Sequence, residues 1–184
     1  MLPRTPRLRF ERLDRLESRL SHRLAEFSRH IPTLWLFRAV SRLGDWPAWV
    51  MLALLQPLWH GKAGWLIAVH WGLTASVAAL LYRVLKTRLC RERPYITYST
   101  IRCTMPPVDR YSFPSGHTLH AAMFTCLTAA TTPQLLPIVI PIAILIAASR
   151  VVLGLHYVSD VVVGALIGAG LAWCSGLIAL FAGS

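Results

Sequence analysis

The stretch GWLIAVHWGLTASVAALLYRVL, residues 64–85, decides the fold class of this chain. As an α-helix its 22 residues measure about 33 Å, which matches the hydrocarbon thickness of a bilayer. The rest of the chain has the same character, because 55% of its 184 residues are hydrophobic, 15% are charged and the mean hydropathy is +0.51. We therefore expect one membrane-embedded domain, with no room for a separate soluble module.

Four further apolar segments follow the same logic, separated by Pro, Gly and charged residues. The sequence therefore predicts an all-α integral membrane protein built as a bundle of about five transmembrane helices. The predicted spans are Trp46–Trp59, Gly64–Leu85, Ser115–Thr131, Leu135–Leu153 and Val158–Phe181. Pro137 and Pro141 should kink or delay the start of the fourth span. Four glycines should let the fifth span pack closely on its neighbours: Gly154, Gly164, Gly168 and Gly170.

Residues 1–30 form a basic segment ahead of the membrane domain, which occupies residues 31–184. They hold eight arginines and four acids, and apolar side chains recur at steps of three and four from Leu13 to Ile31. This pattern predicts an amphipathic helix, placed either on anionic headgroups, which we favour, or as a solvated helix against its own domain. The next segment, Ile31–Leu43, is too short to span, which predicts a re-entrant or interfacial helix.

The net charge indicates the kind of partner, and the cysteines and acids indicate whether a disulfide or a metal site is expected. A net charge of +11 suggests nucleic acid or an anionic membrane, and the hydrophobicity favours the membrane, so we expect no nucleic-acid partner. The cysteines lack CxxC pairing, and only Cys90 and Cys103 are placed to form a disulfide. Four of the eight acids lie in the N-terminal segment and the other four are scattered, which argues against the carboxylate cluster of a two-metal site. The weaker alternative, a zinc site, would use His117, His120, His156 and Asp160.

Polar residues gather in three clusters at span ends, where ionisable groups are costly and therefore functional candidates. The first is KTRLCRERP, residues 86–94. Lys86 and Arg93 are seven residues apart, which would put them two turns apart on one helical face. The alternative is a pair of cations that snorkel at the membrane edge.

The second cluster, PSGH at residues 114–117, opens the third span. Ser115 is a good N-cap residue, and Gly116 lets an anion approach the first-turn amides, which carry the positive end of the helix dipole. His117 adds a titratable proton donor at the same place. The alternative is a plain helix cap beside an incidental histidine.

The third cluster, SRVVLGLHYVSD at residues 149–160, joins the fourth span to the fifth. His156 and Asp160 have a helical spacing at which the carboxylate can accept the Nδ1 proton and leave Nε2 free as a nucleophile or base. Arg150 supplies a planar fork that suits phosphate oxygens. The structural alternative is a buried His–Asp pair that serves only stability.

The order of the spans places all three clusters on one membrane face. The second span ends at the first cluster, the loop leads to the second cluster, and the third and fourth spans return the chain to the third. Together the clusters supply cations, a helix N-terminus and two histidines, one with a carboxylate partner. This set suits phosphoryl transfer through a phosphohistidine.

These motifs resemble the type 2 phosphatidic acid phosphatase superfamily, whose signature reads KxxxxxxRP, PSGH and SRxxxxxHxxxD. Every signature position is filled here, and the resemblance covers residues 46–182. It implies a lipid phosphate hydrolase that needs no metal or cofactor. In such an enzyme His156 would attack phosphorus, Asp160 would orient it, and His117 would protonate the leaving oxygen and then activate water. The phosphoryl oxygens would be held by Lys86, Arg93, Arg150 and the amides of Ser115 and Gly116.

Several substrates and more than one reaction are compatible with these motifs. A site level with the headgroups suits phosphatidate, phosphatidylglycerophosphate or undecaprenyl diphosphate. A lipid phosphotransferase would use the same residues, and a non-catalytic lipid-binding scaffold would tolerate their substitution. Oligomeric state cannot be read from the sequence.

The distribution of charge predicts the orientation. Ten basic residues lie in the region up to Arg42 and most later ones fall on the active-site face, while the other face has Lys62. By the positive-inside rule, we expect a bacterial inner-membrane protein whose active site faces the cytoplasm. The resemblance points the other way, because many bacterial relatives act on the outer face, so a periplasmic site is the alternative.

Overall fold

The computed structural model describes residues 10–107 and 109–182, and all regular elements in those ranges are helical. Residues 1–9, the start of the predicted amphipathic segment, lie outside the described part. The helices are α1 (Glu11–Glu26), η2 (Phe27–Arg29), α2 (Ile31–Leu43), α3 (Trp46–Leu54), α4 (Pro57–His60), α5 (Ala63–Leu89), α6 (Pro94–Thr97), α7 (Gly116–Thr131), η3 (Pro133–Leu135), α8 (Leu136–Val152) and α9 (Val158–Ala182).

Three helical segments in the described residues are long and apolar enough to cross a membrane: Ala63–Leu89, Pro133–Val152 and Val158–Leu177. They confirm the prediction of an all-helical integral membrane protein. The count of five spans is not established by length alone, since α7 has 16 residues. The predicted span Trp46–Trp59 is divided, because Leu55 and Gln56 separate α3 from α4 and Pro57 starts the second piece.

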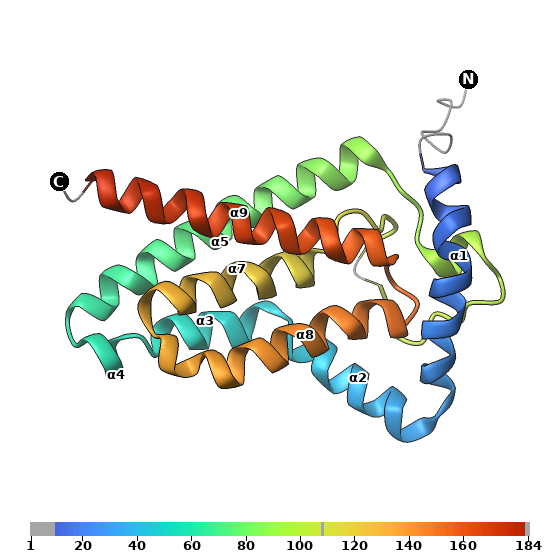
Figure 1. The fold of residues 1–184 in the computed structure, drawn as a ribbon, viewed down its shortest axis with the longest axis horizontal. Coiled ribbons are helices and arrows are strands. Elements are labelled where there is room, and N and C mark those ends of the chain that lie inside the picture. Colours follow the sequence, from blue (N-terminus) through green and yellow to red (C-terminus); the bar gives the residue numbers. More distant parts are fainter. Residues whose placement is uncertain (1–9, 108, 183–184) are drawn as a thin grey trace.

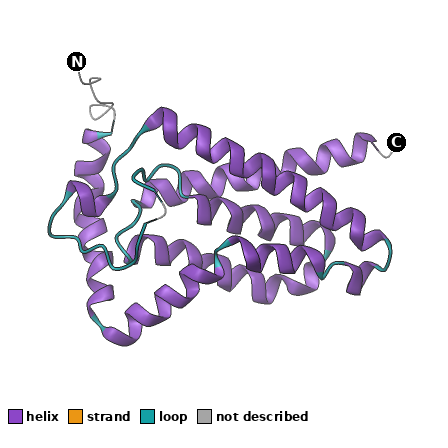
Figure 2. Ribbon diagram, turned by 180° about the vertical axis from the view of Figure 1, so that it is seen from behind, coloured by secondary structure: helices purple, strands orange, loops and turns teal. Residues whose placement is uncertain are grey.

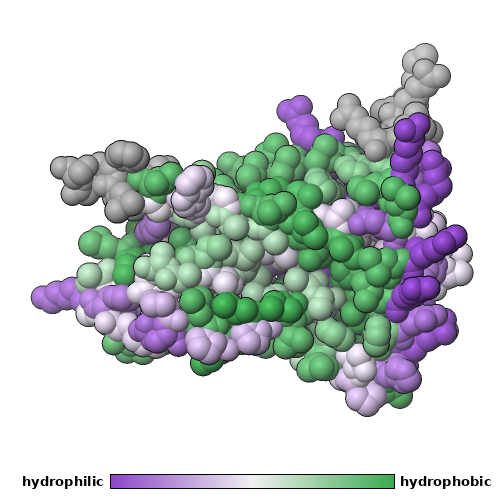
Figure 3. Space-filling model, in the orientation of Figure 1, coloured by the Kyte–Doolittle hydropathy of each residue, from purple (hydrophilic) through white to green (hydrophobic). Residues whose placement is uncertain are grey.

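The long helices run side by side and α1 crosses one end of the bundle (Figure 1). The longest loops gather at that same end (Figure 2). Hydrophobic side chains cover much of the visible flank of the bundle, and hydrophilic ones line the edge formed by α1 (Figure 3). This distribution is the one expected of a bundle whose flank faces lipid and whose α1 end faces an aqueous boundary.

Helix α7 lies in the middle of the core. Its Phe124 stacks on Trp49 of α3 at 5.0 Å between ring centroids and meets Trp71 of α5 edge-on at 5.7 Å. Trp71 is fully buried, so aromatic contacts join three helices at this level.

Glycines set the close approach of α9 to α7. A Cβ added at Gly168 would lie 2.0 Å from the carbonyl oxygen of Leu119, and one at Gly164 would lie 2.7 Å from that of Ser115. The prediction of close packing is confirmed at these two positions. At Gly170 the space is open, so the prediction is wrong there. The chain continues through Pro141 inside α8, and a 3₁₀ turn precedes that helix.

Candidate active site

The first cluster is split between a helix and a loop. Lys86 lies in the last turn of α5, which ends at Leu89 because Cys90 adopts a left-handed conformation with φ 49°. Arg93 follows in extended backbone, at the residue before α6. The prediction that Lys86 and Arg93 share one helical face is therefore wrong. Both side chains are nevertheless buried and line the same cavity.

Asp109 brings the two cations together. Lys86 Nζ donates to Asp109 Oδ2 at 2.6 Å, and Arg93 Nη2 donates to Oδ1 at 2.9 Å. Arg93 Nε also donates to the backbone carbonyl of Asp109 at 2.8 Å. One carboxylate thus bridges the two cations that were predicted to hold phosphate oxygens. The sequence analysis missed this role, because a lone acid in a loop carries no spacing signal.

The second cluster opens α7 as predicted, with Ser115 at the N-cap position. Ser115 differs from its predicted phosphate-binding role: its N–H donates to the carbonyl oxygen of Asp160 at 3.0 Å, and its Oγ lies 3.0 Å from the Thr118 hydroxyl. Its N–H therefore ties α7 to α9, while its hydroxyl bonds within the first turn of α7. The first intrahelical bond runs from Leu119 N–H to Ser115, so the amides of Gly116 and the next two residues precede the helical ladder. Gly116 lines the cavity.

His117 has a partner that the sequence analysis also missed. Its Nε2 lies 2.9 Å from Oδ1 of Asp45, the residue before α3. The two residues are far apart in the sequence, so no local pattern connects them. The Asp45 carboxylate is placed to accept a hydrogen bond from Nε2–H, which would fix the orientation of the ring.

The third cluster lies at the turn between α8 and α9. The Arg150 side chain is buried, its Nη1 donates to Ser41 Oγ, and its Nε has no partner among the described residues. His156 Nε2 lies 3.2 Å from Nη1 of Arg93, and its Nδ1 lies 3.5 Å from Oδ2 of Asp160. Because Arg93 can only donate, Nε2 is the unprotonated nitrogen and Nδ1–H faces Asp160. This is the tautomer a nucleophilic Nε2 needs.

The surroundings of His156 keep the ring neutral. Burial lowers the pKa of His156 well below its usual value of 6.5, and the positive charges of Arg93, Arg150 and Lys86 lower it further. His117 and Asp160 are the other titratable groups that face the ring. A neutral imidazole retains the lone pair needed for attack on phosphorus.

A cavity of about 590 Å³ connects these groups. Its polar end holds the side chains of Lys86, Arg93, Asp109, His117, Arg150 and His156. Its remaining walls come largely from α3 and α5, where Trp46, Trp49, Val50, Ala68, Ala75 and Ala79 line it. A charged head and an apolar chain would therefore both find matching surfaces within one cavity.

The structure also places the residues considered for a metal site and for a disulfide. Within the described residues, no group of three or more His, Cys, Asp or Glu side chains is placed to hold a metal ion. Cys90 and Cys103 are both free thiols, bonded to the carbonyls of Thr87 and Met105.

The fold and the cavity together define the class: a helical integral membrane protein whose cavity brings a buried histidine together with three cations. The model of the PAP2 superfamily matches residues 63–181, so the chain belongs to this superfamily, as the motifs indicate. Decaprenylphosphoryl-5-phosphoribose phosphatase of Mycobacterium tuberculosis is 34% identical over 137 residues, which is 72% of each chain. The chain is accordingly an enzyme, a phosphoric monoester hydrolase.

Two solved structures share the architecture. Aquifex aeolicus LpxE is similar with a TM-score of 0.73 and 26% identity, over 87% of this chain and 94% of that one. A PAP2-type phosphatidylglycerolphosphate phosphatase from Bacillus subtilis has the same fold, with a TM-score of 0.71 and 22% identity over 93% of this chain and 88% of that one.

Proposed function

We propose that this protein hydrolyses a lipid phosphate through a covalent phosphohistidine on His156, without a metal ion. The observation that carries the proposal is the placement of His156. Its Nε2 is held by Arg93 at 3.2 Å inside a cavity that Lys86 and Arg150 also line, and its Nδ1 faces Asp160. A buried neutral imidazole among cations suits nucleophilic attack on a phosphoryl group, because the cations offset the charge that develops in the transition state.

The reaction runs in two displacements. In the first, Nε2 of His156 bonds to phosphorus, the bond from phosphorus to the lipid oxygen breaks, and His117 gives that oxygen a proton. In the second, His117 takes a proton from water, the hydroxide bonds to phosphorus and the nitrogen–phosphorus bond breaks. Asp160 stabilises the imidazolium that forms on His156, and Asp45 does the same for His117.

The shape of the cavity favours a lipid substrate. The apolar wall between α3 and α5 continues from the phosphate end, which suits a chain attached to the phosphate. The mycobacterial relative is named for a decaprenylphosphoryl sugar phosphate, which adds a polyprenyl-linked phosphate to phosphatidate, phosphatidylglycerophosphate and undecaprenyl diphosphate as candidates.

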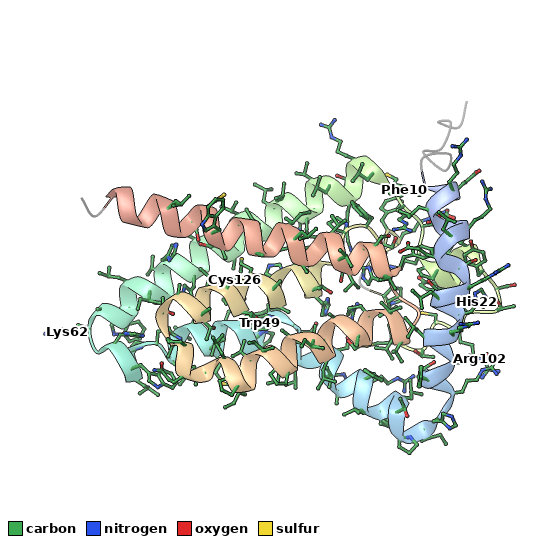
Figure 4. All side chains as sticks on the ribbon, viewed as in Figure 1. Phe10, His22, Trp49, Lys62, Arg102 and Cys126 are labelled. Atoms are coloured by element: carbon green, nitrogen blue, oxygen red, sulfur yellow. The ribbon has the colours of Figure 1, made fainter. Side chains whose placement is uncertain are left out.

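The membrane placement is part of the proposal. Helices α3–α4 and α7 complete a bundle of five spans, and α1 and α2 lie at the interface of a bacterial inner membrane. On α1, Leu16 and Leu20 are 79% and 46% exposed, which supports contact with lipid beside anionic headgroups that attract its arginines. Lys62 lies at the opposite end of the bundle from His22 and Arg102 (Figure 4), and this asymmetry supports a cytoplasmic active site.

The test is phosphate release by the detergent-purified protein from the candidate lipids, in EDTA. We expect release to persist in EDTA, to vanish in His156→Ala, and to stay at the wild-type level in His30→Ala, an exposed histidine outside the cavity. A phosphoenzyme that is stable in base and labile in acid should be trapped from the wild type and be absent from His156→Ala.

Each outcome bears on a different part of the proposal. Loss of activity in EDTA would refute the metal-free mechanism, and activity in His156→Ala would refute the assignment of the nucleophile. Phosphate that appears on an added acceptor lipid instead of in solution would identify a phosphotransferase. Without turnover of any lipid, the scaffold function becomes the better explanation.

A further inference from the structure

Arg91 lies between the signature residues Lys86 and Arg93, at a position that the motif leaves free. Its side chain is fully buried in the loop after α5. Its guanidinium carbon lies 4.1 Å from the ring centroid of Tyr157 and 5.1 Å from that of Phe10. An arginine this deeply buried needs acceptors for all of its N–H groups, because an unpaired buried charge is strongly destabilising.

The acceptors come from two separate parts of the chain. From α1, Asp14 Oδ1 accepts from Nε and Nη2 at 2.9 and 2.7 Å, and Glu17 Oε2 accepts from Nη2 at 2.8 Å. From α9, the Ser159 hydroxyl and Asp160 Oδ1 each accept from Nη1 at 2.6 Å. Every N–H of the guanidinium is therefore engaged, and Arg91 bridges α1 to the acid that faces His156.

Glu17 makes a second link to the same turn. Its Oε1 accepts the backbone N–H of Ser159 at 2.8 Å, and its Oε2 accepts the Ser159 hydroxyl at 2.7 Å. It thus caps the first turn of α9 from another helix, next to Asp160.

Helix α1 faces the catalytic domain with its polar side. Asp14, Glu17 and the buried Ser21 point inward, while Leu16 and Leu20 remain exposed. A helix that docked only for stability would bury its leucines. The inward carboxylates of α1 instead bond Arg91 and the start of α9, and α1 lies outside the residues matched by the family model.

We propose that Asp14, Glu17 and Arg91 are positioning residues for catalysis, through which α1 holds Asp160 in place behind His156. This inference rests on the proposed role of Asp160. The Asp160 carboxylate is fully buried, so it needs the cation of Arg91 to stay ionised. It must also share its two oxygens between Arg91 on one side and Tyr157 N–H and His156 on the other.

The carboxylates of Asp14 and Glu17 determine how strongly Arg91 attracts Asp160. They take three of the hydrogen bonds of Arg91 and offset its charge. When they are neutral, the guanidinium attracts Asp160 more strongly and draws the carboxylate away from the 3.5 Å contact with His156. Loss of the Glu17 cap also frees the turn that carries Asp160.

The test compares Asp14→Asn/Glu17→Gln with the matched control Glu26→Gln, which removes a charge from an exposed position on the same helix. Turnover of the lipid substrate is expressed per site able to bind orthovanadate, a phosphate analogue, so that unfolded protein is not counted. We expect the double variant to lose about ten- to hundredfold in kcat, as is usual for groups that orient a catalytic ligand, with KM within about twofold. Glu26→Gln should match the wild type.

A second arm asks whether the effect passes through Arg91. The Arg91→Lys substitution keeps the positive charge and removes the planar fork of the guanidinium. In this background, Asp14→Asn/Glu17→Gln should lower kcat by less than about a further twofold. Wild-type kcat per site in Asp14→Asn/Glu17→Gln, a rise in KM instead of a fall in kcat, or full additivity with Arg91→Lys would each overturn the inference. Failure of the wild type to release phosphate would instead overturn the proposed function on which it rests.

Discussion

Substitution of Gly168 by alanine tests the close approach of α9 to α7. The new Cβ would lie 2.0 Å from the Leu119 carbonyl oxygen and 3.1 Å from the Met123 amide nitrogen, both backbone atoms that cannot rotate away. Ordinary contact begins near 3.4 Å, so the helices must separate by about 1.4 Å at this point. Overpacking of this kind costs about 1–3 kcal/mol, which corresponds to a fall of about 2–10 °C in the unfolding midpoint.

The activity of Gly168→Ala should fall by more than its loss of folded protein explains. The first turn of α9 carries Asp160, and its carbonyl accepts the Ser115 N–H, so separation of the helices moves Asp160 away from the N-terminus of α7. A displacement near 1 Å at a reacting group costs about a hundredfold in rate. The assays are thermal unfolding in detergent and phosphate release from a lipid substrate.

Gly170→Ala is the matched control, since nothing lies within 4 Å of its added Cβ on the same helix. Here the higher helix propensity of alanine should leave the midpoint unchanged or raise it by the equivalent of about 1 kcal/mol. Equal midpoints and equal activities for Gly168→Ala and Gly170→Ala would refute the packing argument.

Three further predictions follow from the site and from α1. Asp109→Asn removes the carboxylate that competes with phosphate for the two cations, so the Ki of inorganic phosphate should fall about three- to tenfold in inhibition assays; an unchanged Ki would show that Asp109 does not compete. Because burial lowers the pKa of His156, its neutral form persists below pH 6.5, and the plateau of kcat/KM should extend below that pH before activity is lost on acidification; an acid limb at or above pH 6.5 would contradict this. Leu16→Ser/Leu20→Ser should reduce activity on anionic vesicles severalfold and leave activity on a short-chain substrate in detergent unchanged; equal losses in both assays would argue against lipid contact.

Much of the fold could be predicted from the sequence because local signals set most helix boundaries. Ile31–Leu43 is found as predicted, and α7 and α9 begin within a residue of their predicted starts. The end of α5 could not be predicted in the same way, because Cys90 adopts a left-handed conformation without being a glycine. That turn removes Arg93 from the helix. Lys86 and Arg93 are brought together by their shared contact with Asp109 and not by helical spacing.

The signature residues could be predicted because each motif is a short run of sequence with a recognisable spacing. Their partners could not be predicted, because they come from distant parts of the chain. Asp45 reaches His117 across 72 positions, and Arg91 reaches Asp14 across 77. Such pairs depend on how the bundle closes, which no local period encodes. The amphipathic pattern of α1 also gave no sign that its polar side would pack inward, because the period identifies two faces without saying which one docks.

The position of Asp109 between two cations has a physical cause. Lys86, Arg93 and Arg150 are buried close together beside His156, and without phosphate their mutual repulsion would oppose folding. Asp109 supplies the missing negative charge at Lys86 and Arg93, so the cations stay arranged for a phosphoryl group before one arrives. In the proposed reaction each substrate displaces this contact, and the contact re-forms after each product leaves, so we expect it to lower the affinity for free phosphate. Weaker binding of free phosphate favours turnover, because slow release of a tightly bound product would limit the rate.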